Sequence, residues 1–378
     1  MKIAVLGLFP EDAGRIVGGV EAVTFRLCEG LSRIEDADVH AMVAVKGRPE
    51  GLRALAPNWT VHSIGGTGRF GNILFARPDR ARMVRALRRI GPDIVHAHST
   101  DRHALAALDS GMPAVVSIHG VIEIETKLER RPAERFRGFF RERMVADALR
   151  RVRNVIYVSP YLRDLYGPRL AHARTWVVEN PVGPVFFEQR AEPDDTTVLF
   201  SGLVIPRKGI RSLLAAAALA RKEAPGLRLR IAGLQPNPAY LEEVKRRIGE
   251  LGLEEAVVFT GGLAPDELAG EIARAAFMVL VSRQDTSPVS IQEAMAVGRP
   301  VIGSSIGGIP HLVKEGETGF LVPYGDPELL ARRMTELLAN EELRRRFSAR
   351  AREEAERRFS IDAIGRNHWN IYREILAG

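Results

Sequence analysis

Cysteine, aromatic residues and long apolar runs are scarce in this sequence, and each shortage excludes a class of protein. The single cysteine, Cys28, cannot form an internal disulfide or a metal site of several thiolates, so we expect it to pack within the first helix. No apolar run reaches the roughly 18 residues that a membrane-spanning helix needs. The N-terminus, "MKIAVLGLFP", passes directly into a strand pattern instead of a signal peptide. These features predict a cytoplasmic protein.

The charge is unevenly divided along the chain. Residues 1–185 contain 28 Lys and Arg against 20 Asp and Glu, whereas residues 186–378 contain 26 against 27. Nucleic-acid binding is a weak explanation for this excess, because aromatic residues make up only 6% of the chain and no recognition motif accompanies the charge. An anionic substrate, an anionic lipid surface and a merely solvated face all stay open.

Buried strands alternate with helices along the whole chain. Its 378 residues exceed the size at which one hydrophobic core keeps growing, which favours two domains. We therefore predict an α/β protein with two Rossmann-like, doubly wound parallel-sheet domains, residues 1–185 and 186–359, with residues 360–378 crossing back onto the first. A proline-rich linker is expected near residues 182–195. The predicted strands are "KIAVLGL", "DIVHAHS", "AVVSIHG", "NVIYVSP" and "TWVVENP", then "TVLFSGL", "LRLRIAGL", "AVVFTGG", "FMVLVSR", "PVIGSS" and "GFLVP".

The stretch "SRQDTSPVSIQEAMAVGRPVIG" contains the start of a helix that suits an anion. Ser287 is predicted as its N-cap and Pro288 as its first residue, so that the amides of Val289 and Ser290 are available to a ligand. Glu293 lies on the same side of this helix, among small and apolar residues. A carboxylate there either faces water or accepts hydrogen bonds from a pair of sugar hydroxyls.

Further candidates follow other strands. Lys208 stands before Gly209 at the entry to a helix, where it suits a phosphate or is simply a solvated cation. Gly18 and Gly19 lie between the first strand and the first helix, in a loop too long for the dinucleotide fingerprint, which disfavours a dehydrogenase. Glycine there would still let the backbone approach a diphosphate.

Histidines also end predicted strands. His119 stands at the end of "SIHG", facing a ligand or serving a structural role. His96 and His98 in "VHAHS" have a metal-like spacing, but no further ligand accompanies them, and no Asp-x-Asp motif of the kind that binds a diphosphate through a metal is visible. We therefore expect no metal site.

The segment "RPAERFRGFFRERMVADALRR" combines an apolar stripe with positive charge. Between Lys127 and Arg153 there are 10 basic and 4 acidic residues. The stripe either packs into the core with a solvated rim or contacts anionic lipid or a lipid-linked acceptor. It consists of Phe136, Phe140, Met144 and Ala148.

The run from Asp285 through "EAMAVGRPVIGSSIGGIPHLVKEGETGFLVPYGD" closely resembles the signature of the family 4 retaining glycosyltransferases of the GT-B fold. Looser matches, "GGVE", "DIVHAHS", "SIHG" and "RKG", extend the resemblance over essentially the whole chain. The resemblance implies a cleft between two domains that binds a nucleotide-diphosphate sugar.

The resemblance also implies roles for individual residues. Asp285 would contact the donor sugar near the reacting carbon, and Glu293 would hold the nucleotide ribose. Lys208 would neutralise the diphosphate, His119 would lie near the donor sugar and phosphate, and the amide of Gly19 would meet the distal phosphate. The further residues expected to bind the donor are Gly18, Arg207, Ser287, Val289, Ser290, Gly262 and Leu263.

Four positions depart from the family pattern. The first acid of the family's glutamate pair is Asp285, which is one methylene shorter. The arginine that usually accompanies the lysine falls on Leu203, so Arg207 is the candidate substitute. The usual Phe-Gly is Ser287 and Pro288, and Pro288 has no amide to offer the donor sugar.

The sequence therefore predicts a metal-independent hexosyltransferase that retains anomeric configuration and requires no cofactor. Its substrates would be a nucleotide sugar and a saccharide or lipid-linked acceptor, used in cell-surface polysaccharide or glycolipid synthesis. It would work in the cytoplasm, with peripheral contact to an anionic membrane on its inner face. Two alternatives remain: a nucleotide-sugar-binding protein without turnover, and a nucleotide-sugar epimerase, which needs no acceptor.

Overall fold

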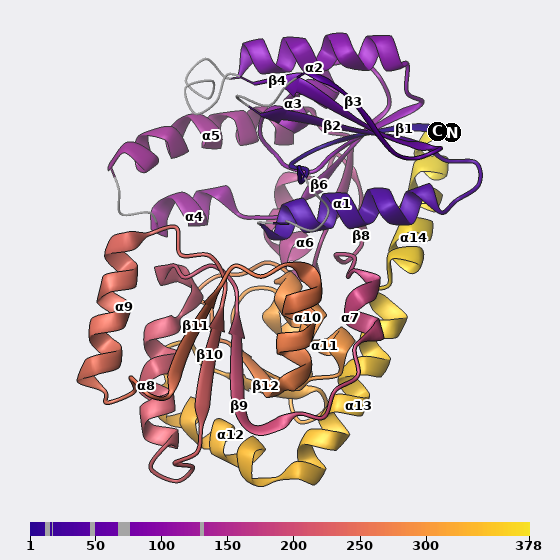
Figure 1. The fold of residues 1–378 in the computed structure, drawn as a ribbon. Coiled ribbons are helices and arrows are strands. Elements are labelled where there is room, and N and C mark those ends of the chain that lie inside the picture. The colour runs from indigo at the N-terminus through magenta and orange to yellow at the C-terminus, as the bar shows by residue number, and fades with distance from the viewer. Residues whose placement is uncertain (12–15, 17, 46–49, 67–75, 129–131) are drawn as a thin grey trace. The chain divides into compact units, whose positions relative to one another are not determined.

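A computed structural model describes residues 1–11, 16, 18–45, 50–66, 76–128 and 132–378. The described chain forms two compact units (Figure 1). Unit 1 comprises residues 1–11, 18–181 and 361–378, and unit 2 includes residues 182–360. Each unit has a predominantly parallel sheet with helices on both faces, which confirms the predicted α/β fold class.

The sheet of unit 1 has the strand order β3-β4-β2-β1-β5-β6-β7-β8. Its strands are parallel except for β3, which pairs antiparallel with β4. The β3 and β4 strands were not among the predicted ones. They run antiparallel because only two residues, Pro57 and Asn58, join them, and so short a turn reverses the chain. The strands are β1 Lys2–Leu6, β2 Asp38–Val45, β3 Gly51–Ala56, β4 Trp59–Gly65, β5 Ile94–Ala97, β6 Ala114–Ile118, β7 Asn154–Tyr157 and β8 Arg174–Val177.

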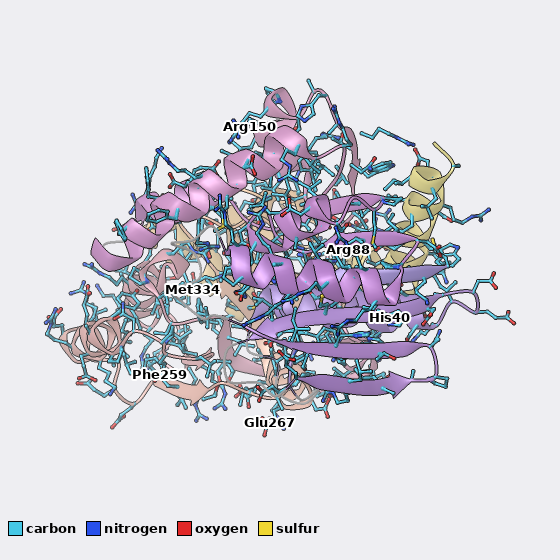
Figure 2. The ribbon with its side chains drawn as sticks, turned by 90° about the horizontal axis from the view of Figure 1, so that it is seen from above. His40, Arg88, Arg150, Phe259, Glu267 and Met334 are labelled. Carbon is cyan, nitrogen blue, oxygen red and sulfur yellow. The ribbon has the colours of Figure 1, made fainter. Side chains whose placement is uncertain are left out.

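Helices cover both faces of this sheet. The α2, α3 and α5 helices pack side by side on one face, whereas α1 and α14 pack together on the other. The first of these layers displays basic side chains, including the exposed Arg88 on α2 and Arg150 on α5 (Figure 2). The helices are α1 Gly19–Ser32, α2 Arg77–Ile90, α3 Arg102–Asp109, α4 Ile122–Leu128, α5 Pro132–Arg151, α6 Pro160–Tyr166 and α14 Ile361–Leu376, with a 3-10 turn at Gly167–Arg169.

The sheet of unit 2 is parallel throughout its described strands, with the order β11-β10-β9-β12-β13-β14. Helices α8, α9 and α12 lie on one face, and α7, α10, α11 and α13 lie on the other. The strands are β9 Asp194–Ser201, β10 Arg228–Ala232, β11 Val257–Gly261, β12 Ala275–Leu280, β13 Val301–Ser304 and β14 Gly319–Val322. The helices are α7 Pro184–Glu188, α8 Ile210–Ala220, α9 Pro238–Glu250, α10 Pro265–Arg274, α11 Val289–Val297, α12 Pro327–Ala339 and α13 Glu341–Arg358, with 3-10 turns at Pro206–Lys208 and Ile309–His311.

The segment expected to be a linker belongs largely to unit 2. Val182 and Phe186 are buried in its core, and α7 begins at Pro184, where a missing N–H costs nothing. The units change over between Pro181 and Val182 and between Ser360 and Ile361, near the sequence-based boundaries at 185 and 359. In place of the expected exposed linker, the structure thus has a helix that starts with proline and packs apolar side chains into the core of unit 2.

The α1 helix, which contains Cys28, packs against the C-terminal helix α14 in unit 1. Cys28 is fully buried in α1, as expected, and burial raises the pKa of its thiol. The α1 helix packs on α14, where Gly30 meets the backbone at Ile361 and Gly365. A side chain at either glycine would overlap backbone atoms of the other helix.

We predict that Gly30→Ala destabilises unit 1 by about 1 to 3 kcal/mol, because a Cβ there would overlap the carbonyl oxygen of Ile361. Denaturant unfolding monitored by circular dichroism measures the effect. Gly51→Ala, at the exposed start of β3 in the same unit, is the matched control, since nothing lies within 4 Å of a Cβ there and its φ is not positive. Equal unfolding midpoints for the two variants would contradict this packing.

Candidate functional site

In unit 2, Lys208 and Asp285 follow two neighbouring strands. Lys208 comes after β9, and Asp285 comes after β12, which pairs with β9 in parallel. Parallel strands end at the same edge of a sheet, so both side chains lie beyond its carboxyl edge. This edge is where doubly wound sheets bind their ligands.

A compact ionic cluster connects these two segments. The Lys208 ammonium donates a hydrogen bond to Oδ2 of Asp285 at 2.8 Å. The Arg207 guanidinium donates to the carbonyl oxygen of Gln284 at 2.6 Å and lies 3.4 Å from Oδ1 of Asp285. Arg207 therefore reaches the same carboxylate as Lys208.

The cluster is largely shielded from water. The side chains of Lys208 and Asp285 are each 11% exposed, and that of Arg207 is 25% exposed. Desolvation raises the pKa of Asp285, but the opposing charges of Lys208 and Arg207 outweigh it, so the pKa lies below its ordinary value of 3.8. Asp285 is thus ionised near neutral pH. An ammonium has three N–H donors, so binding Asp285 leaves Lys208 able to bind an anion as well.

Glycines hold the backbone of this cluster in place. Gly209 has φ +75° and Gly307 has φ +63°, values that favour glycine, and a Cβ at either would overlap a backbone oxygen, of Val281 and Asp285 respectively. The amide of Gly308 donates to the carbonyl oxygen of Asp285 at 2.9 Å. The loop after β13 thereby fixes the position of the acid.

The α11 helix differs from its prediction at its first residues. It begins at Val289, its N-cap is Pro288, and no side chain caps it, so the expected Ser287 cap and Pro288 first position are wrong. Proline has no amide, and its ψ of 116° keeps it outside the helix. The first turn of a helix still has N–H groups without intrahelical acceptors, those of Val289 and Ser290 included.

Glu293 lies on the least buried side of α11. Val289, Ser290 and Glu293 are partly exposed, whereas the other residues of the helix are buried. The carboxylate is therefore neither enclosed in the core nor fully solvated. Gly262 and Leu263 follow β11 at the edge of the same sheet, and a Cβ at Gly262 would require the exposed side chain of Leu234 to move.

Unit 1 brings together a second group of predicted residues. His98 and His119 follow the neighbouring parallel strands β5 and β6, and Nδ1 of His98 lies 2.9 Å from Nε2 of His119. The glycine pair stands at the start of α1, with Gly18 as its N-cap and Gly19 as its first residue. Both glycines are exposed, which is compatible with close approach of a ligand.

The rings of unit 1 form a buried stack. His96 bonds Tyr372 through Nδ1 and Ser117 through Nε2, both at 2.7 Å, and its ring centroid lies 4.1 Å from that of His98. Burial lowers the pKa of His119 and of His368 to about 4, so both are neutral at pH 7. Because protein side chains occupy both ring nitrogens of His96, the metal-like spacing has a structural explanation. Within the described residues, no group of three or more His, Cys, Asp or Glu could hold a metal ion.

Sequence reasoning missed several residues that shape these sites. Gly307 and Gly308 were part of the recognised run, but no role was assigned to them. A glycine pair directly after a predicted strand was a usable signal for a tight loop. No comparable signal indicated that Gln284 would bind Arg207 through its backbone.

Comparison with known families agrees with this arrangement. Residues 17–185 match the family model described as Glycosyltransferase Family 4, and residues 184–354 match Glycosyl transferases group 1. The chain belongs to the family 4 glycosyltransferases of the GT-B fold. The resemblance identified from the sequence is thus confirmed.

Relatives of this family 4 chain include alpha-maltose-1-phosphate synthase of Mycolicibacterium smegmatis, 28% identical over the full length of both proteins. N-acetyl-alpha-D-glucosaminyl L-malate synthase of Bacillus anthracis is 35% identical over 34% of this chain and 33% of that protein. The match thus spans about a third of the latter's length.

Two solved structures share the fold. Sucrose-phosphate synthase from Thermosynechococcus elongatus has a TM-score of 0.81 at 20% identity, covering 100% of this chain and 99% of that one. HepE of Anabaena, in complex with UDP and glucose, has a TM-score of 0.76 at 20% identity, covering 99% of this chain and 100% of that one.

We predict that Asp285→Asn lowers the unfolding free energy of unit 2 by up to about 3 kcal/mol at pH 7, because it removes the acceptor charge of a shielded ion pair. The depressed pKa means that this stabilisation is fully present above pH 3.8 and is lost as the pH falls through the lower folded value. The difference in unfolding free energy between Asp285→Asn and the wild type should therefore be constant between pH 7 and 5.

Denaturant unfolding at both pH values measures this difference. The exposed Glu255→Gln in the same unit is the control and should unfold like wild type. A difference that shrinks between pH 7 and 5 would contradict the assigned pKa direction.

Proposed function

We propose that the chain is a retaining glycosyltransferase that transfers a sugar from a nucleotide-diphosphate sugar to an acceptor hydroxyl without a metal ion. The observation that carries this proposal is the cationic pair Arg207 and Lys208, held on Asp285 at the carboxyl edge of the unit 2 sheet. A diphosphate leaving group carries negative charge that two cations and nearby amides stabilise. The complex of HepE with UDP and glucose supports a nucleoside diphosphate sugar as the donor class.

In this reaction the bond between the anomeric carbon and the phosphate oxygen breaks. A new bond forms between the same carbon and the acceptor oxygen, on the same face of the sugar. The acceptor's proton passes to the departing phosphate. Lys208 and Arg207 stabilise the charge that develops on the diphosphate, together with the first amides of α11. Asp285 orients Lys208 and contacts the donor sugar.

The remaining donor contacts follow from the geometry of α11. Glu293 stands on the accessible side of this helix, beside Val289 and Ser290. We assign its carboxylate to the hydroxyls of the nucleotide ribose, which are good donors to a partly shielded anion. His119 of unit 1 is assigned to the donor sugar and phosphate, and it acts there as a neutral group. The acceptor is a saccharide or a lipid-linked saccharide of cell-surface polysaccharide or glycolipid synthesis.

We predict that Lys208→Ala lowers kcat about 100- to 1,000-fold, the usual effect of removing one preorganised donor from a developing anion. Arg207→Gln should lower kcat as well, because it removes the second cation. A thermal-shift panel of nucleotide sugars first identifies the donor, since a ligand of the folded state raises the melting temperature. Release of the nucleoside diphosphate, with water or an added acceptor, then measures turnover.

Arg211→Gln is the matched control for these variants. Arg211 lies near Arg207 in the sequence, but its side chain is 67% exposed and pairs with Glu243, outside the proposed site. Its kcat should stay within about twofold of wild type. If calorimetry detects donor binding but no turnover follows, the chain is a binding protein and not a transferase. Conversion of the donor to another nucleotide sugar, without net release of the nucleoside diphosphate, would indicate an epimerase.

We further propose that the N-terminal half of α5, around Phe136 and Phe139, contacts an anionic membrane from the cytoplasm. The predicted apolar stripe divides in the structure: Met144 and Ala148 are buried, whereas Phe136 is 58% exposed. Phe139, 48% exposed, lies beside it, with the Arg143 guanidinium 4.5 Å from its ring centroid. Exposed aromatic rings beside basic side chains fit a negatively charged lipid surface. Among the described helices, none is long and apolar enough to cross a bilayer.

We predict that the protein co-sediments with vesicles of anionic lipid and that a Phe136→Ala, Phe139→Ala double variant loses most of this binding, because its apolar contact is removed. The control is Leu52→Ala, which removes another exposed apolar side chain of unit 1, 72% exposed on β3. Equal sedimentation of the wild type with anionic and neutral vesicles would rule out the membrane contact.

A further inference from the structure

His98 is the immediate neighbour of His119, a residue assigned to the donor. The inference that follows therefore rests on the proposed function and deepens it. His98 is 2% exposed, and its ring lies between those of His96, at a centroid distance of 4.1 Å, and His119, at 5.0 Å. Its amide donates to the carbonyl oxygen of Leu6 at 2.8 Å. The ring therefore has one well-defined position next to His119.

One hydrogen lies between the two rings. Nδ1 of His98 and Nε2 of His119 are 2.9 Å apart, a distance that requires one nitrogen to donate and the other to accept. Burial lowers the pKa of both rings, so neither carries a second hydrogen at neutral pH. Two arrangements of the hydrogen between the rings are therefore possible: either His98 donates to His119, or His119 donates to His98.

The other nitrogen of His98 distinguishes the two arrangements. Its Nε2 is buried and has no hydrogen-bond partner among the described protein atoms. If His119 donated, Nε2 of His98 would carry a buried N–H without an acceptor. If His98 donates, Nε2 carries only a lone pair, and buried acceptors without partners are tolerated more often than buried donors. The second arrangement is favoured.

We propose that His98 is a positioning residue that donates from Nδ1 and thereby holds His119 in the neutral tautomer with its hydrogen on Nδ1. In this tautomer the remaining ring nitrogen of His119 is a hydrogen-bond donor and is not a general base. A neutral donor suits the acceptor oxygens of a sugar or a phosphate. Such a role explains why two histidines follow neighbouring strands at the same sheet edge.

Nuclear magnetic resonance of the protein labelled with 15N-histidine tests the tautomer without any substrate. Long-range 1H–15N correlations distinguish Nδ1–H from Nε2–H rings, and His119→Gln identifies the His119 signals. We expect the Nδ1–H pattern for His119 in wild type. His98→Asn places an amide nitrogen near the position of Nδ1 and should preserve this pattern. His98→Leu has no donor and should shift His119 toward Nε2–H.

Two variants separate positioning from simple structural support. We expect kcat to fall about tenfold or more in His98→Leu and to recover largely in His98→Asn, because one donor hydrogen bond differs between them. The exposed His172→Gln should lose only the signals of His172 and should change neither the His119 signals nor turnover. An Nε2–H pattern for His119 in the wild type overturns the proposal, even if His98→Leu does not fold. Absence of glycosyl transfer by the wild type would instead overturn the proposed function and leave the tautomer result intact.

Discussion

Parallel pairing of buried strands is the constraint on which both sites depend. In a parallel sheet every strand ends at the same edge, so the residue after each strand meets the residues after its neighbours. Lys208 and Asp285 meet because β9 and β12 are neighbours, although 77 positions separate them in the sequence. His98 and His119 meet in unit 1 because β5 and β6 are neighbours. Side chains that are not neighbours in the sequence thus become hydrogen-bonded pairs.

The two sites accommodate buried polar groups in opposite ways. The unit 2 cluster keeps its charges and pairs them, since Asp285 has two cationic neighbours and a depressed pKa. The unit 1 cluster stays neutral, since burial lowers the pKa of His119 and of His368 to about 4. Charge in the unit 2 cluster suits the leaving diphosphate of the proposed reaction. A neutral ring suits a group that offers a directed hydrogen bond.

Departures from the family pattern concentrate in the ionic cluster. Leu203 carries no charge, yet Arg207 brings a guanidinium to the same carboxylate from the position next to Lys208. Asp285 has a shorter side chain than glutamate, and the loop containing Gly307 and Gly308 packs directly on its backbone. The two changes are mutually consistent, because a shorter acid brings its partners closer to the main chain.

The sequence alone was sufficient for the fold class, for most strands and for the residues at their ends. Continuous apolar runs are typical of strands in a sheet that is buried on both faces. The family signature identified the candidate site residues. Strands β2, β3 and β4 were not anticipated, and β3 is mostly exposed, so its apolar signal is weak. Only the tertiary structure decided that Arg207 shares Asp285 with Lys208, and that His98 contacts His119. Hydrogen bonds of this kind depend on strand order and on ångström-scale distances, which no local pattern of residues encodes.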